Sequence, residues 1–326
     1  MNQAYKNQGW YKKEGILFDN KNENLFYCIS QSLFSGKHTT TYKYCFLKSL
    51  LDNLYSFTDE YSISFNEIGE TFASIYWNMI VVHKIPQMSN YSTGERSIFE
   101  KIAEEMVAQK PYLSSVNYFS INNEDRKYYL KRAIPELSKN VIGSFYKDTN
   151  GMIFGFSKKE KRIWLNSFSF KFLCTNKTII EQVNYYQWLK MVEAILKSNN
   201  RTIDNLSTIL ECITQRNDLS KFKKQLEYMG EGKKCFYCGK KLDNNYHLDH
   251  VIPWSFIRND NLWNLVCSCP RCNASKNNII PDKEFLKKLS TRNTKLNIFS
   301  PDIFEVAKVA VLNGVRTNWR PKKNEN

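Results

Sequence analysis

Four cysteines in two Cys-x-x-Cys pairs enclose a run of polar residues in the last third of this 326-residue chain. The pairs are Cys235 with Cys238 and Cys269 with Cys272. Two intervening residues let both thiolates of a pair reach one ion, so two pairs complete a tetrahedral set with no open position. The spacing therefore predicts a structural Zn²⁺ site, against the alternative of four buried, reduced thiols. Cys267 is a weaker candidate for the second pair, because its neighbours are apolar.

The run between the pairs contains the residue types that phosphodiester hydrolysis requires. In Tyr246-His247-Leu248-Asp249-His250, a strand would place His247 and Asp249 on one face and His250 on the other. Attack on a phosphodiester near neutral pH needs a base beside the water and a cation on the phosphate. Histidine suits the first role by its pKa, and aspartate suits the second by its charge and hard oxygens. The pattern therefore indicates a hydrolytic site built on Asp249 and His250.

The segment as a whole, roughly residues 233–278, resembles the HNH, or ββα-metal, endonuclease family. It has, in order, a thiol pair, Asp-His followed by two apolar residues and Pro, an Asn, a second thiol pair, an Asn and a Lys. The resemblance implies that His250 is the general base and that Asp249 binds a divalent cation, Mg²⁺ or Mn²⁺. It also implies that Asn264 orients the base, that Asn273 is the second metal ligand, and that Lys276 lies over the phosphate.

Three residues depart from the family pattern or fall outside it. Asn273 stands where some members have a third His, and since Asn is a weaker ligand we expect loose metal binding. His247 matches no required position, so it could be an extra ligand, a phosphate contact or a surface residue. Asn277, four residues after Asn273, could also face the cation.

The charge of the chain indicates a nucleic-acid partner. The net charge is +15, and residues 216–326 carry 21 basic and 11 acidic residues, so two thirds of the excess lies on one third of the chain. A phosphate backbone requires such a surface. We therefore expect double-stranded DNA as the partner. The similarity to bacterial restriction and phage-defence nucleases adds a second copy of the chain, or a defence-complex protein, as a possible further partner.

Other properties of the sequence bear on location. No stretch approaches the length of apolar chain that a membrane span needs, and the first residues lack the apolar core of a secretory signal. The nine cysteines, an odd number, argue against a disulfide framework. We expect a cytoplasmic protein that does not associate with a membrane.

The predicted fold class is α+β, in three parts. Residues 1–215 form a mostly helical recognition or oligomerisation domain with a small β insertion, 216–300 the ββα-metal nuclease domain, and 301–326 a C-terminal helix and basic tail. Helical periodicity and capping residues predict helices over about 40–54, 64–86, 95–109 and 179–196. A hairpin is predicted around residues 145–156, followed by a strand over 163–174, where Phe168, Phe170 and Phe172 alternate with polar residues.

The combined prediction is a metal-dependent endonuclease that hydrolyses DNA in restriction or anti-phage defence. The family implies 5′-phosphate and 3′-hydroxyl ends. A nuclease that cuts RNA by the same chemistry stays open, because one-metal hydrolysis does not depend on the 2′-hydroxyl. A third hypothesis is a zinc-dependent nucleic-acid-binding module without catalysis, and the joint presence of Asp249, His250, Asn264 and Asn273 argues against it.

Overall fold

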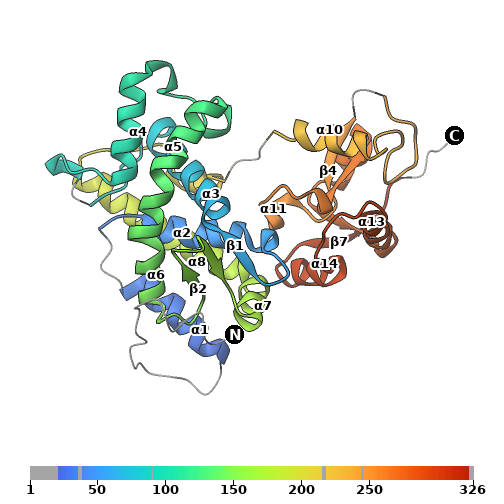
Figure 1. The fold of residues 1–326 in the computed structure, drawn as a ribbon, viewed down its shortest axis with the longest axis horizontal. Coiled ribbons are helices and arrows are strands. Elements are labelled where there is room, and N and C mark those ends of the chain that lie inside the picture. Colours follow the sequence, from blue (N-terminus) through green and yellow to red (C-terminus); the bar gives the residue numbers. More distant parts are fainter. Residues whose placement is uncertain (1–20, 36–38, 90, 215–217, 244–245, 323–326) are drawn as a thin grey trace. The chain divides into compact units, whose positions relative to one another are not determined.

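A computed structural model describes residues 21–35, 39–89, 91–214, 218–243 and 246–322. The chain divides into two compact units between residues 215 and 216. Helices dominate both units, and the described strands form small sheets of two or three strands, which confirms the predicted α+β class (Figure 1). No helix among the described residues is long and apolar enough to cross a membrane.

The N-terminal unit is a helical assembly in which α3 packs against α2 and α5, and α2 also packs against α8. A three-stranded antiparallel sheet in the order β1-β3-β2 joins it. Its elements are α1 (Lys21–Ser30), α2 (Tyr42–Asp52), β1 (Ser62–Ser64), α3 (Phe65–Trp77), α4 (Ile98–Gln109), α5 (Asn123–Glu136), α6 (Gly143–Asp148), β2 (Gly155–Ser157), β3 (Arg162–Trp164), α7 (Ser167–Thr175), α8 (Lys177–Ser198) and α9 (Leu206–Glu211). Short 3₁₀ or π turns connect several of them.

Two helices of this unit begin at capping boxes, and the sequence predicts the first of them. The Ser64 hydroxyl accepts the Glu67 backbone N–H, and the Glu67 carboxylate accepts the Ser64 N–H in return. Ser97 and Glu100 form the same box at the start of α4. Each box satisfies two backbone donors that would otherwise lack partners, so the local sequence sets where the helix starts. The helix predicted over about 40–54 begins after Thr41, whose side chain makes no capping hydrogen bond.

The structure corrects the predicted hairpin and the long strand after it. Residues 143–148 are helical, and the Gly151 N–H bonds the Tyr146 carbonyl, so the predicted turn ends a helix instead of joining two strands. Of the strand predicted over 163–174, only the first two residues are in a strand, β3 (Arg162–Trp164). Asn166 then caps α7 by accepting the Ser169 N–H. The alternation of phenylalanines was misleading because Phe172 and its neighbour Leu173 are both buried, which a helix allows.

The C-terminal unit contains the predicted motif. Its elements are α10 (Ser220–Tyr228), β4 (His247–His250), α11 (Trp254–Ile257), β5 (Leu265–Ser268), α12 (Pro270–Lys276), β6 (Ile279–Pro281), α13 (Lys283–Lys295), α14 (Ile303–Leu312) and β7 (Arg316–Trp319). Strands β4 and β5 are antiparallel, and β6 and β7 are parallel.

A strand near the C-terminus, which the sequence did not predict, packs into this unit. Strand β7 pairs with β6, and the Trp319 ring packs edge-on to Tyr237 with centroids 5.1 Å apart. The Trp319 carbonyl also accepts the Asp282 N–H at 2.9 Å. Residues 316–319 are therefore part of the packed unit, and the helix predicted after residue 301 is α14.

Candidate nuclease site

The core of the site is an antiparallel strand pair with one short helix on it. In the β4–β5 ladder Asp249 lies opposite Val266 and His250 opposite Leu265. Helix α12 follows β5 directly and packs against β4. This is the ββα arrangement expected from the sequence, and it brings the polar residues of β4 beside those of α12.

The four predicted cysteines form one cluster. The Sγ atoms of Cys235, Cys238, Cys269 and Cys272 all lie within 4.8 Å of one another. The Sγ atoms of Cys238 and Cys269 are 3.9 Å apart. Thiolates 2.3 Å from a tetrahedral zinc ion would be about 3.8 Å apart, so the cluster fits a structural Zn²⁺. Cys267 lies on β5, outside this group.

Local sequence explains how each thiol pair is shaped. Gly239 follows the first pair with a φ of +72°, a conformation that glycine adopts without strain, and its N–H bonds the Cys235 carbonyl. Cys269 occupies the cap position before α12, and Pro270 fills the first helical position, where no N–H is needed. The zinc site would therefore join the 235–240 turn to the start of α12.

His250 is buried and its ring is held by an aspartate that the sequence analysis missed. Its Nε2 lies 2.9 Å from Oδ1 of Asp260, and both side chains are almost fully buried. A carboxylate at one imidazole nitrogen fixes the ring and directs the other nitrogen, Nδ1, away from it. Asp260 lies in the loop between α11 and β5, and no spacing rule in the sequence distinguishes it from its neighbours.

Asn264 is fully buried, and its side-chain hydrogen bonds go to the backbone of Ile252 and not to the His250 ring. Its Oδ1 accepts the Ile252 N–H and its Nδ2 donates to the Ile252 carbonyl, both at 2.8 Å. The side-chain amide thus supplies hydrogen-bond partners for both backbone groups of Ile252, in the turn after β4. Asn264 can position the base only indirectly, by fixing the backbone two residues after it.

Asp249 is held from two sides. Its Oδ2 accepts the Tyr237 hydroxyl at 2.6 Å and lies 3.2 Å from the Lys276 ammonium. Burial and the adjacent carboxylate raise the pKa of the Tyr237 phenol well above its usual value, so the hydroxyl remains a donor. Tyr237 lies between the two cysteines of the first pair, so the zinc turn itself presents this donor to Asp249. The sequence did not predict this role, because the spacing of the thiol pair does not show where its spacer side chains point.

Lys276 has a different place from the one expected. Its side chain is fully buried, and its ammonium also donates to the His250 carbonyl at 2.7 Å. The ammonium lies against β4, where its positive charge pairs with the buried Asp249 carboxylate. The expected position over a phosphate is therefore not the one in this structure.

The face of β4 that carries Asp249 also carries His247, as the alternation of the strand requires. Asn273, half-buried on α12, reaches His247: the Asn273 Nδ2 and His247 Nδ1 atoms are 3.1 Å apart. The donor set of this face is a carboxylate, an amide and an imidazole. Carboxylate and amide oxygens are ligands that Mg²⁺ and Mn²⁺ accept, so Asp249 and Asn273 fit a divalent cation by their chemistry.

Replacing Tyr237 by phenylalanine should destabilise the nuclease unit by roughly 1–3 kcal/mol, because a buried carboxylate oxygen loses its hydroxyl donor. Tyr228→Phe is the matched control, since Tyr228 is 92% exposed. Chemical denaturation of both variants, followed by tryptophan fluorescence, measures the difference. Equal stability of the two variants would show that the Tyr237 hydroxyl contributes nothing.

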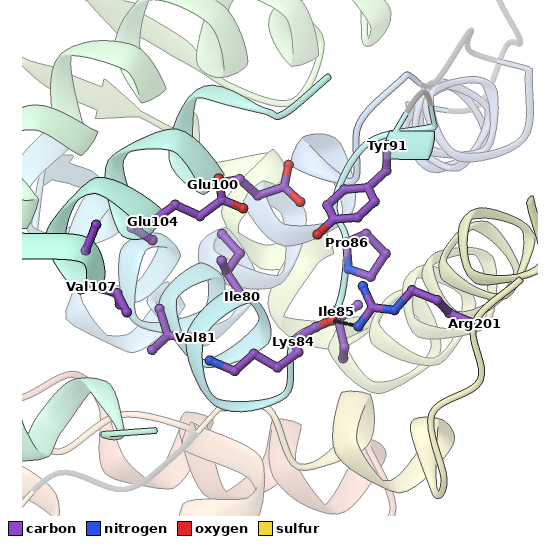
Figure 2. Close-up of a pocket in the computed structure, with 12 residues that line it drawn as sticks. Ile80, Val81, Lys84, Ile85, Pro86, Tyr91, Glu100, Glu104, Val107 and Arg201 are labelled. Atoms are coloured by element: carbon purple, nitrogen blue, oxygen red, sulfur yellow. Dashed lines mark hydrogen bonds between the residues drawn. The ribbon is translucent and has the colours of Figure 1, made fainter. Parts of the chain in front are cut away.

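The N-terminal unit contains a cavity. This cavity has a volume of about 500 Å³ and an apolar floor that includes Ile80, Val81 and Val107 (Figure 2). Its charged groups serve the fold: Glu100 accepts the backbone N–H groups of Gln87 and Ser97, and Arg201 donates to the Lys84 carbonyl. Glu100 and Arg201 are therefore engaged in structural hydrogen bonds.

Comparison with known proteins agrees with this geometry. Residues 235–282 match the sequence pattern of the family described as HNH endonuclease. The matched stretch runs from the first zinc-pair cysteine to the cap of α13, and thus includes all the residues of the strand pair and helix described above. No solved structure matched the chain. The segment from Cys235 to Asp282 is therefore an HNH endonuclease domain.

Proposed function

We propose that this protein is a metal-dependent endonuclease that hydrolyses phosphodiester bonds in double-stranded DNA. The observation that carries the proposal is the arrangement of His250. The buried imidazole of His250 is held at Nε2 by Asp260. It is next to Asp249 in β4, and His247 of the same strand contacts Asn273. A purely structural zinc site would not require a histidine base beside the oxygen ligands Asp249 and Asn273.

His250 would act as the general base in this reaction. Asp260 engages Nε2, so Nδ1 is the nitrogen that takes a proton from the attacking water. The water oxygen forms the new bond to phosphorus, the bond from phosphorus to the 3′ oxygen breaks, and that oxygen takes up a proton from solvent water, so the products are 5′-phosphate and 3′-hydroxyl ends. Removing a proton from water in the transition state contributes typically 10²–10⁴-fold to the rate.

Asp249 and Asn273 would hold the divalent cation, Mg²⁺ or Mn²⁺. When bound, such a cation neutralises charge on the phosphate and on the leaving oxygen. Lys276 and Tyr237 hold Asp249 in place through its carboxylate. The restrained carboxylate loses little side-chain entropy on binding, which offsets part of the weakness of the amide ligand.

Binding to DNA is supported by exposed cations around the thiol pairs. Exposed basic side chains flank the first pair and begin α12: Lys233, Lys234, Lys240, Lys241 and Arg271. Each phosphate that such groups neutralise releases counterions, so binding should weaken steeply with salt. The alternative substrate is RNA, which the same chemistry would cut. A role in restriction or anti-phage defence rests on the family resemblance alone, and the neighbouring genes would test it.

Replacing Asp260 by asparagine should lower kcat about tenfold or more with little change in KM or DNA affinity. The amide keeps the size of the side chain but removes the charge that holds the imidazole. Plasmid-nicking kinetics under Mg²⁺ and Mn²⁺ measure the effect. Asp243→Asn, in the same unit but exposed, is the control. An unchanged kcat for the Asp260 variant would leave His250 without its proposed positioning residue.

A further inference from the structure

His247 is the one histidine of the motif that the proposed mechanism does not use. It begins β4, its side chain is exposed, and it lies on the same strand face as Asp249. Its Nδ1 is 3.1 Å from the Asn273 side-chain amide. This contact places the exposed imidazole of His247 beside Asn273, which is a proposed cation ligand.

The separation of these two atoms is that of neighbouring ligands on one ion. Two ligands about 2.1 Å from a cation, at the right angle of an octahedron, lie roughly 3.0 Å apart. The amide has the same shape after a half-turn, which places Oδ1 where Nδ2 lies. Nδ1 of His247 and Oδ1 of Asn273 would then lie side by side on the face of β4 that also carries Asp249, and a small rotation of the exposed imidazole would turn both toward one cation.

We propose that His247 is a third protein ligand of the catalytic cation and that it shifts the site's preference from Mg²⁺ toward Mn²⁺. The inference rests on the proposed function, because it concerns the cation of the same site. Mg²⁺ favours oxygen ligands and keeps its waters, whereas imidazole nitrogen suits transition metals better. An additional nitrogen ligand also offsets the weak binding expected of Asn273.

The test is the binding of Mn²⁺ to the full-length, zinc-loaded protein without DNA. The electron paramagnetic resonance signal of free Mn²⁺ gives the affinity, and competition by Mg²⁺ gives the affinity for the second ion. We expect His247→Ala to weaken Mn²⁺ binding about tenfold or more, as loss of a metal-site residue does. Its affinity for Mg²⁺ should change less than threefold. Spin-echo modulation from a histidine nitrogen should appear in the wild type and vanish in the variant.

Two controls separate a ligand from a structural residue. His83→Ala changes a histidine in the N-terminal unit and should leave both affinities unchanged. Asn273→Ala should weaken both ions. Zinc content of one ion per chain and an unaltered circular dichroism spectrum verify that His247→Ala is folded.

The remaining outcomes distinguish the inference from the proposed function. If His247→Ala binds Mn²⁺ like the wild type, the third-ligand assignment is wrong, while a metal-dependent nuclease with two protein ligands survives. The same conclusion follows if the variant loses DNA affinity but not Mn²⁺ affinity, since His247 would then contact phosphate. If the wild type binds neither ion and cleaves nothing, the proposed function itself fails.

Discussion

Replacing His250 by alanine should reduce DNA cleavage by roughly 10²–10⁴-fold while leaving DNA affinity nearly unchanged. The imidazole is the base in the proposed mechanism, and His247, the other histidine of β4, contacts Asn273 instead. The exposed cations that would contact phosphate lie elsewhere on the unit. Nicking of supercoiled plasmid by the purified variant, with either Mg²⁺ or Mn²⁺, measures the rate.

The variant needs a check on its fold, because His250 is buried and its loss leaves the Asp260 carboxylate without a partner. The double variant with His250→Ala and Asp260→Asn removes that unpaired charge. It should fold as well as the wild type and be as inactive as the single variant. Near-normal nicking by either form would rule out His250 as the base.

Loss of one zinc-cluster thiol should unfold the nuclease unit. A structural zinc site contributes on the order of 10 kcal/mol to the folding of its local unit, and a Cys₄ set with three thiolates retains little of that. We expect Cys238→Ser and Cys272→Ser to give insoluble protein or a unit without cooperative unfolding. Cys212→Ser, at an exposed cysteine of the N-terminal unit, should behave like the wild type.

Loss of zinc should also abolish DNA cleavage, because residues of the two thiol pairs' segments contact or form the proposed catalytic site. Tyr237, which binds Asp249, lies within the first thiol pair, and Asn273 follows the last thiol of the second pair. Elemental analysis should find one zinc per chain, and a chelator that removes it should abolish cleavage even when Mg²⁺ is restored. Well-folded, active protein that contains no zinc would remove the Cys₄ assignment.

The parts of the site that could be predicted from the sequence are those set by local spacing. The two thiol pairs, the strand around Asp249 and the helix that starts near Asn273 all follow from residues within a few positions of one another. The cluster of four thiols confirms the metal-site spacing. A capping box predicted one N-terminal helix for the same reason, since Ser64 and Glu67 act over three residues. The equivalent box of Ser97 and Glu100 was found only in the structure.

The parts that could not be predicted depend on contacts between distant segments. Asp260 reaches His250 only because the loop after α11 folds back, and Tyr237 meets Asp249 only once the zinc turn packs on β4. The sequence identified Lys276 but could not show that its ammonium points inward, since a lysine at that spacing can bind a phosphate or a carboxylate. The strand predicted over 163–174 failed because alternation among three phenylalanines is too short to distinguish a strand from a helix.

The central claim, metal-dependent hydrolysis of DNA, is tested most directly by the ends that the full-length protein leaves. Supercoiled plasmid and an RNA of matching sequence are each incubated with metal-stripped, zinc-retaining protein, with and without added Mg²⁺ or Mn²⁺. The account predicts nicks in the DNA that appear only with the added cation and that DNA ligase seals without prior treatment, as 5′-phosphate and 3′-hydroxyl ends require. Plasmid that stays intact with both cations, whether or not the RNA is cut, would contradict it.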